Sequence, residues 1–340
     1  MTRVAGKGFL AGLTAGVLVA TLGLPGVATA GPQARTGSAC TLRPLPLPAN
    51  LNGDARVVDP TGRFIAGIGY RVDGDNRQPL LLLWATRPGV FNQPRLTVVE
   101  FQTEPQVHSI NRYGVVIGTA YVGDVYRPWR YVQGRLEWLP VPPVVANVGA
   151  RSINARGDIV GAGAVEQTET ALPLFWPADR PGTVEAIDAP SNSGTVEIFD
   201  DGTIVGGTAV FGWVRRPDGR TDRLTVPGAR WAWVHAARGN WAIGRFGTGS
   251  EDEDSTGVRW DLRTGVATAV HPALGLPNDV NSQGAVLGTR AVDHGDRLVT
   301  LPGAIPGVQI AIGWEIADDG LVVGSTNSAA RLLPVRWTDC

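Results

Sequence analysis

The chain has 340 residues, of which 43% are hydrophobic, and its formal net charge at pH 7 is −1. A hydrophobic share of this size excludes an intrinsically disordered protein, and the near-zero charge gives no attraction for nucleic acid or for an anionic surface. We therefore expect a folded protein without a nucleic acid partner. The 45 glycines and 25 prolines indicate a fold with many tight turns.

The first 30 residues have the pattern of a secretory signal peptide. Arg3 and Lys7 precede an uncharged, apolar stretch from Gly8 to Leu24, and Ala28-Thr29-Ala30 forms a small-residue cleavage site before Gly31. The alternative is an uncleaved membrane anchor, but this stretch is shorter than the ~20 residues that usually span a bilayer. We expect cleavage near Ala30-Gly31, secretion to the outside of a bacterial cell, and no membrane insertion of the mature protein.

A pair of glycines recurs seven times along the rest of the chain. In each copy a turn glycine is followed four or five residues later by a second glycine, with an apolar strand between them. The mean step between turn glycines is 43 residues, which is typical of the blades of a β-propeller. The pairs are Gly62 and Gly67, Gly114 and Gly118, Gly157 and Gly161, Gly202 and Gly206, Gly239 and Gly244, Gly284 and Gly288, and Gly320 and Gly324.

The residues around each pair predict four strands per blade, which we call A to D in chain order. Strand A ends before the turn glycine, and the residue four positions before that glycine is β-branched in six copies but is His235 in the fifth. An Asx residue such as Asp59 or Asn154, three positions before the glycine, is expected to cap the turn. Strand B ends at the second glycine, and strand D ends near Leu-Pro or Val-Pro. Strand C usually ends in a tryptophan that we assign to packing between blades: Trp84, Trp129, Trp176, Trp213, Trp260 and Trp337.

Two copies depart from this pattern. The sixth lacks the tryptophan, and between Gly288 and Pro302 it has room for little more than one further strand. The seventh ends at Cys340 without a strand D. The segment from Cys40 to Pro48 has the Leu-Pro pattern of strand D, so we expect it to close the ring by pairing with the last blade.

The two cysteines, Cys40 and Cys340, would then lie side by side. In a secreted protein an isolated pair indicates a disulfide, and the alternative is two free thiols. The predicted architecture is an all-β, seven-bladed propeller over residues 40–340, preceded by a signal peptide (1–30) and a short linker (31–39). We expect a monomer.

Individual repeat units resemble the extracellular repeats known as HAF repeats. The most similar are Ser152-Ile-Asn-Ala-Arg-Gly-Asp-Ile-Val-Gly161 with Pro173-Leu-Phe-Trp176, and Ser109-Ile-Asn-Arg-Tyr-Gly-Val-Val-Ile-Gly118. The similarity extends over about 54–340, although the His-Ala-Phe element that names the family is absent. The resemblance implies a secreted repeat protein of unassigned activity and identifies no catalytic residue.

The strongest candidates for chemistry lie on the inner strands, which line the central funnel of a propeller. Glu197, Asp279 and Glu315 share one position, five residues before the turn glycine, and His108 and Arg151 lie on the same predicted strands of other blades. Convergent carboxylates and arginines could bind a sugar or perform acid–base catalysis. The alternative is that these polar groups line a wet channel and pair with one another.

A second candidate is the acidic run Glu251, Asp252, Glu253 and Asp254, in a predicted loop between strands B and C. Such a run could take up Ca²⁺, but it lacks the alternating ligand spacing of a defined calcium site, and charge runs are usually solvated loops. The sequence calls for no other cofactor.

We expect an extracellular binding or scaffold module whose ligand is a glycan or a protein. The alternative is an extracellular glycan-active hydrolase or lyase with a carboxylate site in the funnel. Carboxylates about 5–10 Å apart in an open pocket would favour glycoside chemistry, whereas salt-bridged carboxylates would favour a binder.

Overall fold

The computed structural model describes residues 40–340, except 74–75, 88–89, 250–254, 304–309 and 328–330. The predicted signal peptide, the linker and the Glu251–Asp254 run lie outside the described residues. In the described part of the chain, no helix is long and apolar enough to cross a membrane.

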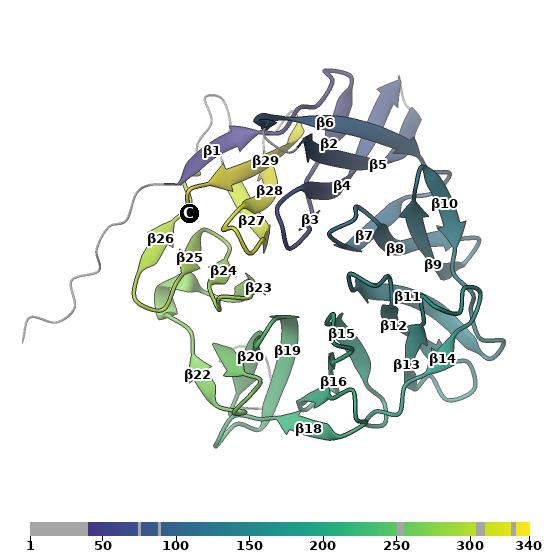
Figure 1. The fold of residues 1–340 in the computed structure, drawn as a ribbon, viewed down its shortest axis with the longest axis vertical. Coiled ribbons are helices and arrows are strands. Elements are labelled where there is room, and N and C mark those ends of the chain that lie inside the picture. Colours follow the sequence, from purple (N-terminus) through teal and green to yellow (C-terminus); the bar gives the residue numbers. More distant parts are fainter. Residues whose placement is uncertain (1–39, 74–75, 88–89, 250–254, 304–309, 328–330) are drawn as a thin grey trace, which may run out of the picture. The chain divides into compact units, whose positions relative to one another are not determined.

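Seven antiparallel sheets are arranged in a ring, and one strand of each, its inner strand, lies nearest the centre (Figure 1). We number the blades in the chain order of their inner strands. Blade 1 contains β2 (Leu51–Gly53), β3 (Val57–Val58), β4 (Phe64–Asp73), β5 (Asn76–Arg87) and β6 (Val90–Glu100). Blade 2 contains β7 (Pro105–Ile110), β8 (Val116–Val122), β9 (Val125–Val132) and β10 (Arg135–Trp138). Blade 3 contains β11 (Val145–Ile153), β12 (Ile159–Val165), β13 (Ala171–Trp176) and β14 (Glu185–Ala186).

The remaining blades follow the same order. Blade 4 contains β15 (Gly194–Ile198), β16 (Ile204–Gly207), β17 (Gly212–Arg215) and β18 (Thr221–Leu224). Blade 5 contains β19 (Trp231–Arg238), β20 (Trp241–Gly247), β21 (Thr256–Asp261) and β22 (Ala267–Ala269), and the 3-10 helix η2 (Pro272–Leu274) follows it. Blade 6 contains β23 (Pro277–Val280), β24 (Val286–Gly288), β25 (Ala291–Asp293) and β26 (Leu298–Thr300). Blade 7 contains β27 (Ile310–Ile316), β28 (Val322–Asn327), β29 (Leu332–Thr338) and β1 (Thr41–Pro44). The inner strands of the seven blades are β3, β7, β11, β15, β19, β23 and β27.

The predicted closure of the ring is confirmed. Strand β1 pairs antiparallel with β29, with Thr41 opposite Thr338, and becomes the outer strand of blade 7. Cys40 and Cys340 form a disulfide with a Cα–Cα distance of 4.6 Å. Blade 6, for which the sequence left room for little more than one strand after Gly288, has four strands, because β25 and β26 are only three residues long each.

The hydrophobic core lies between neighbouring blades, and the strand-C tryptophans occupy it as predicted. Trp84, for example, is fully buried in a cluster with Leu45 and Val323 of blade 7. Its indole N–H donates to the Pro46 carbonyl at 2.8 Å. Trp176, Trp260 and Trp337 likewise donate to the end of the preceding blade's outer strand, at Pro140, Thr225 and Pro302. In these four cases the bond ties the outer strand of one blade to the tryptophan of the next, whereas the indole N–H groups of Trp129 and Trp213 have no such partner among the described residues.

Every innermost strand carries a β-bulge, in which one extra residue has no partner on the second strand. In blade 3 the register shifts between Ala150 and Ser152, which leaves Arg151 as the bulged residue. At the bulge, a carbonyl oxygen of the inner strand lies very close to the second glycine of the repeat. A Cβ on Gly161 would lie only 2.0 Å from the Gly149 oxygen. The second glycine therefore marks a bulge in the neighbouring strand in six of the seven pairs, whereas Gly288 of blade 6 lies against the Leu274 carbonyl of η2.

Candidate functional site

The bulges place two levels of side chains around the central channel. The bulged residues form the first level: Arg56, His108, Arg151, Val196, His235, Asn278 and Trp314. They line a cavity of about 230 Å³, which we call the bulge chamber. The residue after each bulge forms the second level, which includes Glu197, Asp279 and Glu315. Beyond this level, toward the A–B turns, lies a second cavity of about 390 Å³, which we call the mouth cavity.

The structure brings the three predicted carboxylates together around one arginine. Arg238 Nη2 lies 2.9 Å from Glu315 Oε1, and the two side chains are only 15% and 19% exposed. Asp279 is 6% exposed, and it and Glu197 also interact electrostatically with the Arg238 guanidinium. Three carboxylates therefore share a single cation at the second level of the channel.

Burial dominates the electrostatics of this cluster. It raises the pKa of Glu197 to about 7, although a hydrogen bond from Ser152 and the charge of Arg238 oppose the rise. Burial, together with the charge of Asp279, raises the pKa of Glu315 to about 8. Burial also raises the pKa of Asp279 against the attraction of Arg238. Near neutral pH the cluster therefore retains protons that isolated carboxylates would release.

Each carboxylate is also bonded to a neighbouring blade. Glu315 Oε2 accepts the Val58 N–H of blade 1 at 2.8 Å, and Asp279 Oδ2 accepts the Ile316 N–H of blade 7 at 2.9 Å. Ser152, at the same position in blade 3, accepts the Ile198 N–H of blade 4 and donates to Glu197. The second level of the channel thus ties the inner strands of successive blades together.

Arg238 was not among the predicted channel residues, because the repeat alignment placed the inner strand of blade 5 two residues out of register. His235 is the bulged residue of β19 and faces the channel, and Ala237 takes the buried position assigned to His235. Arg238 pairs with Trp241 across a two-residue turn, Gly239-Asn240, which is tighter than the capped turns of the other blades. This glycine–asparagine turn is the signal that could have shifted the alignment by two residues.

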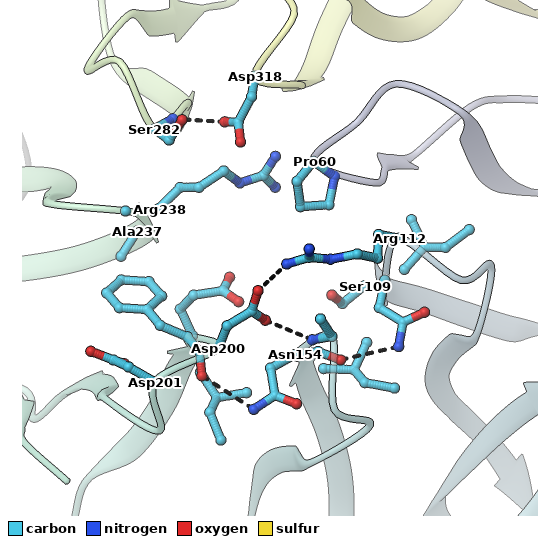
Figure 2. A pocket seen from close by; sticks show the side chains of 18 of the residues that line it. Pro60, Ser109, Arg112, Asn154, Asp200, Asp201, Ala237, Arg238, Ser282 and Asp318 are labelled. Atoms are coloured by element: carbon cyan, nitrogen blue, oxygen red, sulfur yellow. Dashed lines mark hydrogen bonds and ion pairs between the residues drawn. The ribbon is translucent and has the colours of Figure 1, made fainter. Parts of the chain in front are cut away.

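The mouth cavity is bordered by the A–B turns, and the predicted Asx caps are confirmed there. Asn154 Oδ1 accepts the Asp158 N–H at 2.9 Å, and Asn154 Nδ2 donates to the Phe199 carbonyl of the next blade at 3.1 Å. Figure 2 shows Arg112 pointing toward Asp200, with which it forms an ion pair between blades 2 and 4. Bonds between blades therefore line this opening as well.

The bulge chamber has a different character, since basic groups come together on blades 1 to 3. Arg56 Nε is paired with Asp54 at 2.6 Å, and its guanidinium lies 5.3 Å from the centre of the Trp314 ring. Burial and the nearby charge of Arg151 lower the pKa of His108 to about 4. Within the described residues, Arg151 itself has no hydrogen bond or ion pair; its side chain is exposed to the channel, and the partial loss of solvent inside the ring lowers its pKa.

The described part of the chain contains no defined metal-binding site. No three His, Cys, Asp or Glu side chains come together there in a way that could hold a metal ion. The Glu251–Asp254 run, the predicted candidate for Ca²⁺, lies outside the described residues.

Comparisons with known proteins define the fold. No family model and no curated protein matches the sequence. The β-propeller domain of the Trilobed protease from Pyrococcus furiosus aligns with a TM-score of 0.59 at 10% identity, over 85% of this chain and 96% of that domain. That domain has an open velcro topology, whereas β1 completes blade 7 here.

A second structure, the acylaminoacyl peptidase of Pyrococcus horikoshii, aligns with a TM-score of 0.57 at 8% identity, over 85% of this chain. This chain spans about half of the peptidase, 51% of its length. These structural similarities establish a β-propeller fold, and at such low sequence identity they assign no activity.

Proposed function

We propose that this protein is secreted and acts outside the cell as a binding or scaffold module, with its ligand site in the central channel. The signal-peptide pattern of residues 1–30 supports secretion. The Cys40–Cys340 disulfide also supports it, because such bonds persist in oxidising compartments. The channel contains two cavities lined by polar side chains, and the larger, of about 390 Å³, falls within the size range of small-ligand pockets.

The observation that favours binding over hydrolysis is the engagement of all three carboxylates. A glycosidase needs one carboxyl group to protonate the leaving oxygen and a second to attack or to activate water. Here Glu315 is bound to Arg238 and to the Val58 N–H, and Asp279 accepts the Ile316 N–H. Using these groups for proton transfer would weaken the bonds that connect the blades.

The test is to incubate the oxidised mature protein with an array of neutral, acidic and amino-sugar glycans, and to measure both retention and product release. We expect saturable retention without new reducing ends. Turnover that Glu197→Gln or Asp279→Asn abolishes, without a change in the free energy of unfolding, would overturn the proposal in favour of the hydrolase.

A further inference from the structure

The bulge chamber contains a cation that has no ion-pair partner among the described residues. Arg151 protrudes from the bulge of β11 and is exposed to the chamber, yet it forms no hydrogen bond or ion pair within the described residues. Two histidines, His108 and His235, lie on the same level; Arg151 contributes to lowering the pKa of both, and neither supplies a negative charge to it. An arginine in such surroundings is a ready partner for an anionic ligand, since its planar fork can bind a carboxylate with two bonds.

The groups around the chamber are not distributed evenly. Three of the basic side chains, Arg56, His108 and Arg151, come from the adjacent blades 1, 2 and 3, and a fourth, His235, comes from blade 5. The hydrogen-bond acceptors come from blades 4, 6 and 7, where Glu197 and Asp279 line the same cavity. A ligand that fits both sides carries an anionic group at one end and hydroxyl groups at the other.

An aromatic surface lies between these two sides. Trp314, unlike the six blade tryptophans, occupies a bulge position and lines the chamber. Its indole N–H donates to Ser325 Oγ at 3.1 Å, and this bond fixes the ring in place. The fixed, partly exposed ring can stack against the apolar face of a sugar, as large aromatic side chains do in binding sites.

The acidic side of the chamber does not repel such a ligand strongly. Glu315 is paired with Arg238, and Asp279 is stabilised by the same guanidinium and by a backbone N–H. Burial keeps part of the cluster protonated near neutral pH, so these groups can both donate to and accept from hydroxyls.

From this arrangement we infer that the bulge chamber binds a small sugar acid. The carboxylate of the ligand pairs with Arg151, its hydroxyls bond to the Glu197–Asp279 side, and its ring lies against Trp314. A cavity of about 230 Å³ is smaller than the pockets that hold drug-sized ligands, which limits the bound part to one sugar unit. This inference rests on the proposed binding function and specifies its ligand class.

The test is calorimetric titration of the oxidised mature protein with glucuronate, with its neutral counterpart glucose, and with acetate. We expect glucuronate to bind at least tenfold more tightly than either of the others. Arg151→Gln should weaken glucuronate binding by about ten- to a hundredfold, because it removes a charge-assisted hydrogen bond. The matched control is Arg135→Gln, which removes the same charge from the exposed outer strand of blade 2 and should leave the affinity unchanged.

Folding of the variant is not expected to confound this test. Because Arg151 has no partner within the described residues, Arg151→Gln should keep or raise the melting temperature. Equal affinities for glucuronate and glucose, or an Arg151→Gln variant with unchanged glucuronate affinity, would overturn the inference. If another glycan of the array is retained while glucuronate is not, the sugar-acid assignment fails and the binding function stands.

Discussion

Replacing Cys40 with serine removes the covalent closure of the ring while leaving the strand pairing that surrounds it. The disulfide joins residues that are 300 positions apart in sequence. For a loop of this length the chain-entropy relation gives about 5–6 kcal/mol, and measured losses are more often about 2–4 kcal/mol. At about 2 cal/mol/K per residue, the unfolding entropy of a domain this size is roughly 0.6 kcal/mol/K. We therefore expect Cys40→Ser to lower the melting temperature by about 3–6 °C.

The assay is thermal unfolding of the wild type and Cys40→Ser, each with and without a reducing agent. The strand content should not change, because the four pairs between β1 and β29 remain. Reduction should lower the melting temperature of the wild type to that of the variant and should have no effect on the variant. Equal melting temperatures of the two oxidised proteins would refute the reasoning and show that strand pairing alone closes the ring.

Three further perturbations test the packing and the electrostatics. Gly161→Ala should cost about 1–3 kcal/mol in denaturant unfolding, because the new methyl group meets a backbone oxygen, whereas Gly194→Ala faces open space and should be nearly neutral. Between pH 6 and pH 8 the wild type should lose about 1 kcal/mol more stability than Glu197→Gln, because the raised pKa keeps a proton on folded Glu197 that the unfolded chain has already released. In NMR titrations His108 should titrate near pH 4, and Arg151→Gln should raise its pKa by removing a nearby positive charge. An unchanged His108 pKa in that variant would show that burial alone sets it.

Much of the architecture could be predicted because the repeat has a local cause in every blade. The turn glycine requires a positive φ, which is 90° at Gly157, and the second glycine accommodates the bulge of the neighbouring strand. Closure could also be predicted, since Cys40 and Cys340 mark the two ends that had to meet. The glycine pairs could be recognised because their residues lie close together in sequence, and the closure because the chain has only two cysteines.

The organisation of the channel could be predicted only in part. The convergence of Glu197, Asp279 and Glu315 followed from their shared position in the repeat. The partners of these carboxylates could not be predicted in this way, because Arg238 reaches Glu315 from two blades away and the Val58 N–H belongs to a third blade. Contacts of this kind depend on how the ring closes, and a repeat alignment treats each blade separately.

The structural role of the channel carboxylates is tested most directly by a double-mutant cycle between Arg238 and Glu315. The free energy of unfolding is measured for the wild type, Arg238→Met, Glu315→Gln and the double variant. If the pair holds blades 5 and 7 together, each single change should be strongly destabilising, and the coupling energy should be about 1–3 kcal/mol. Additive effects, with a coupling below about 0.5 kcal/mol, would contradict this role and make the carboxylates available for chemistry.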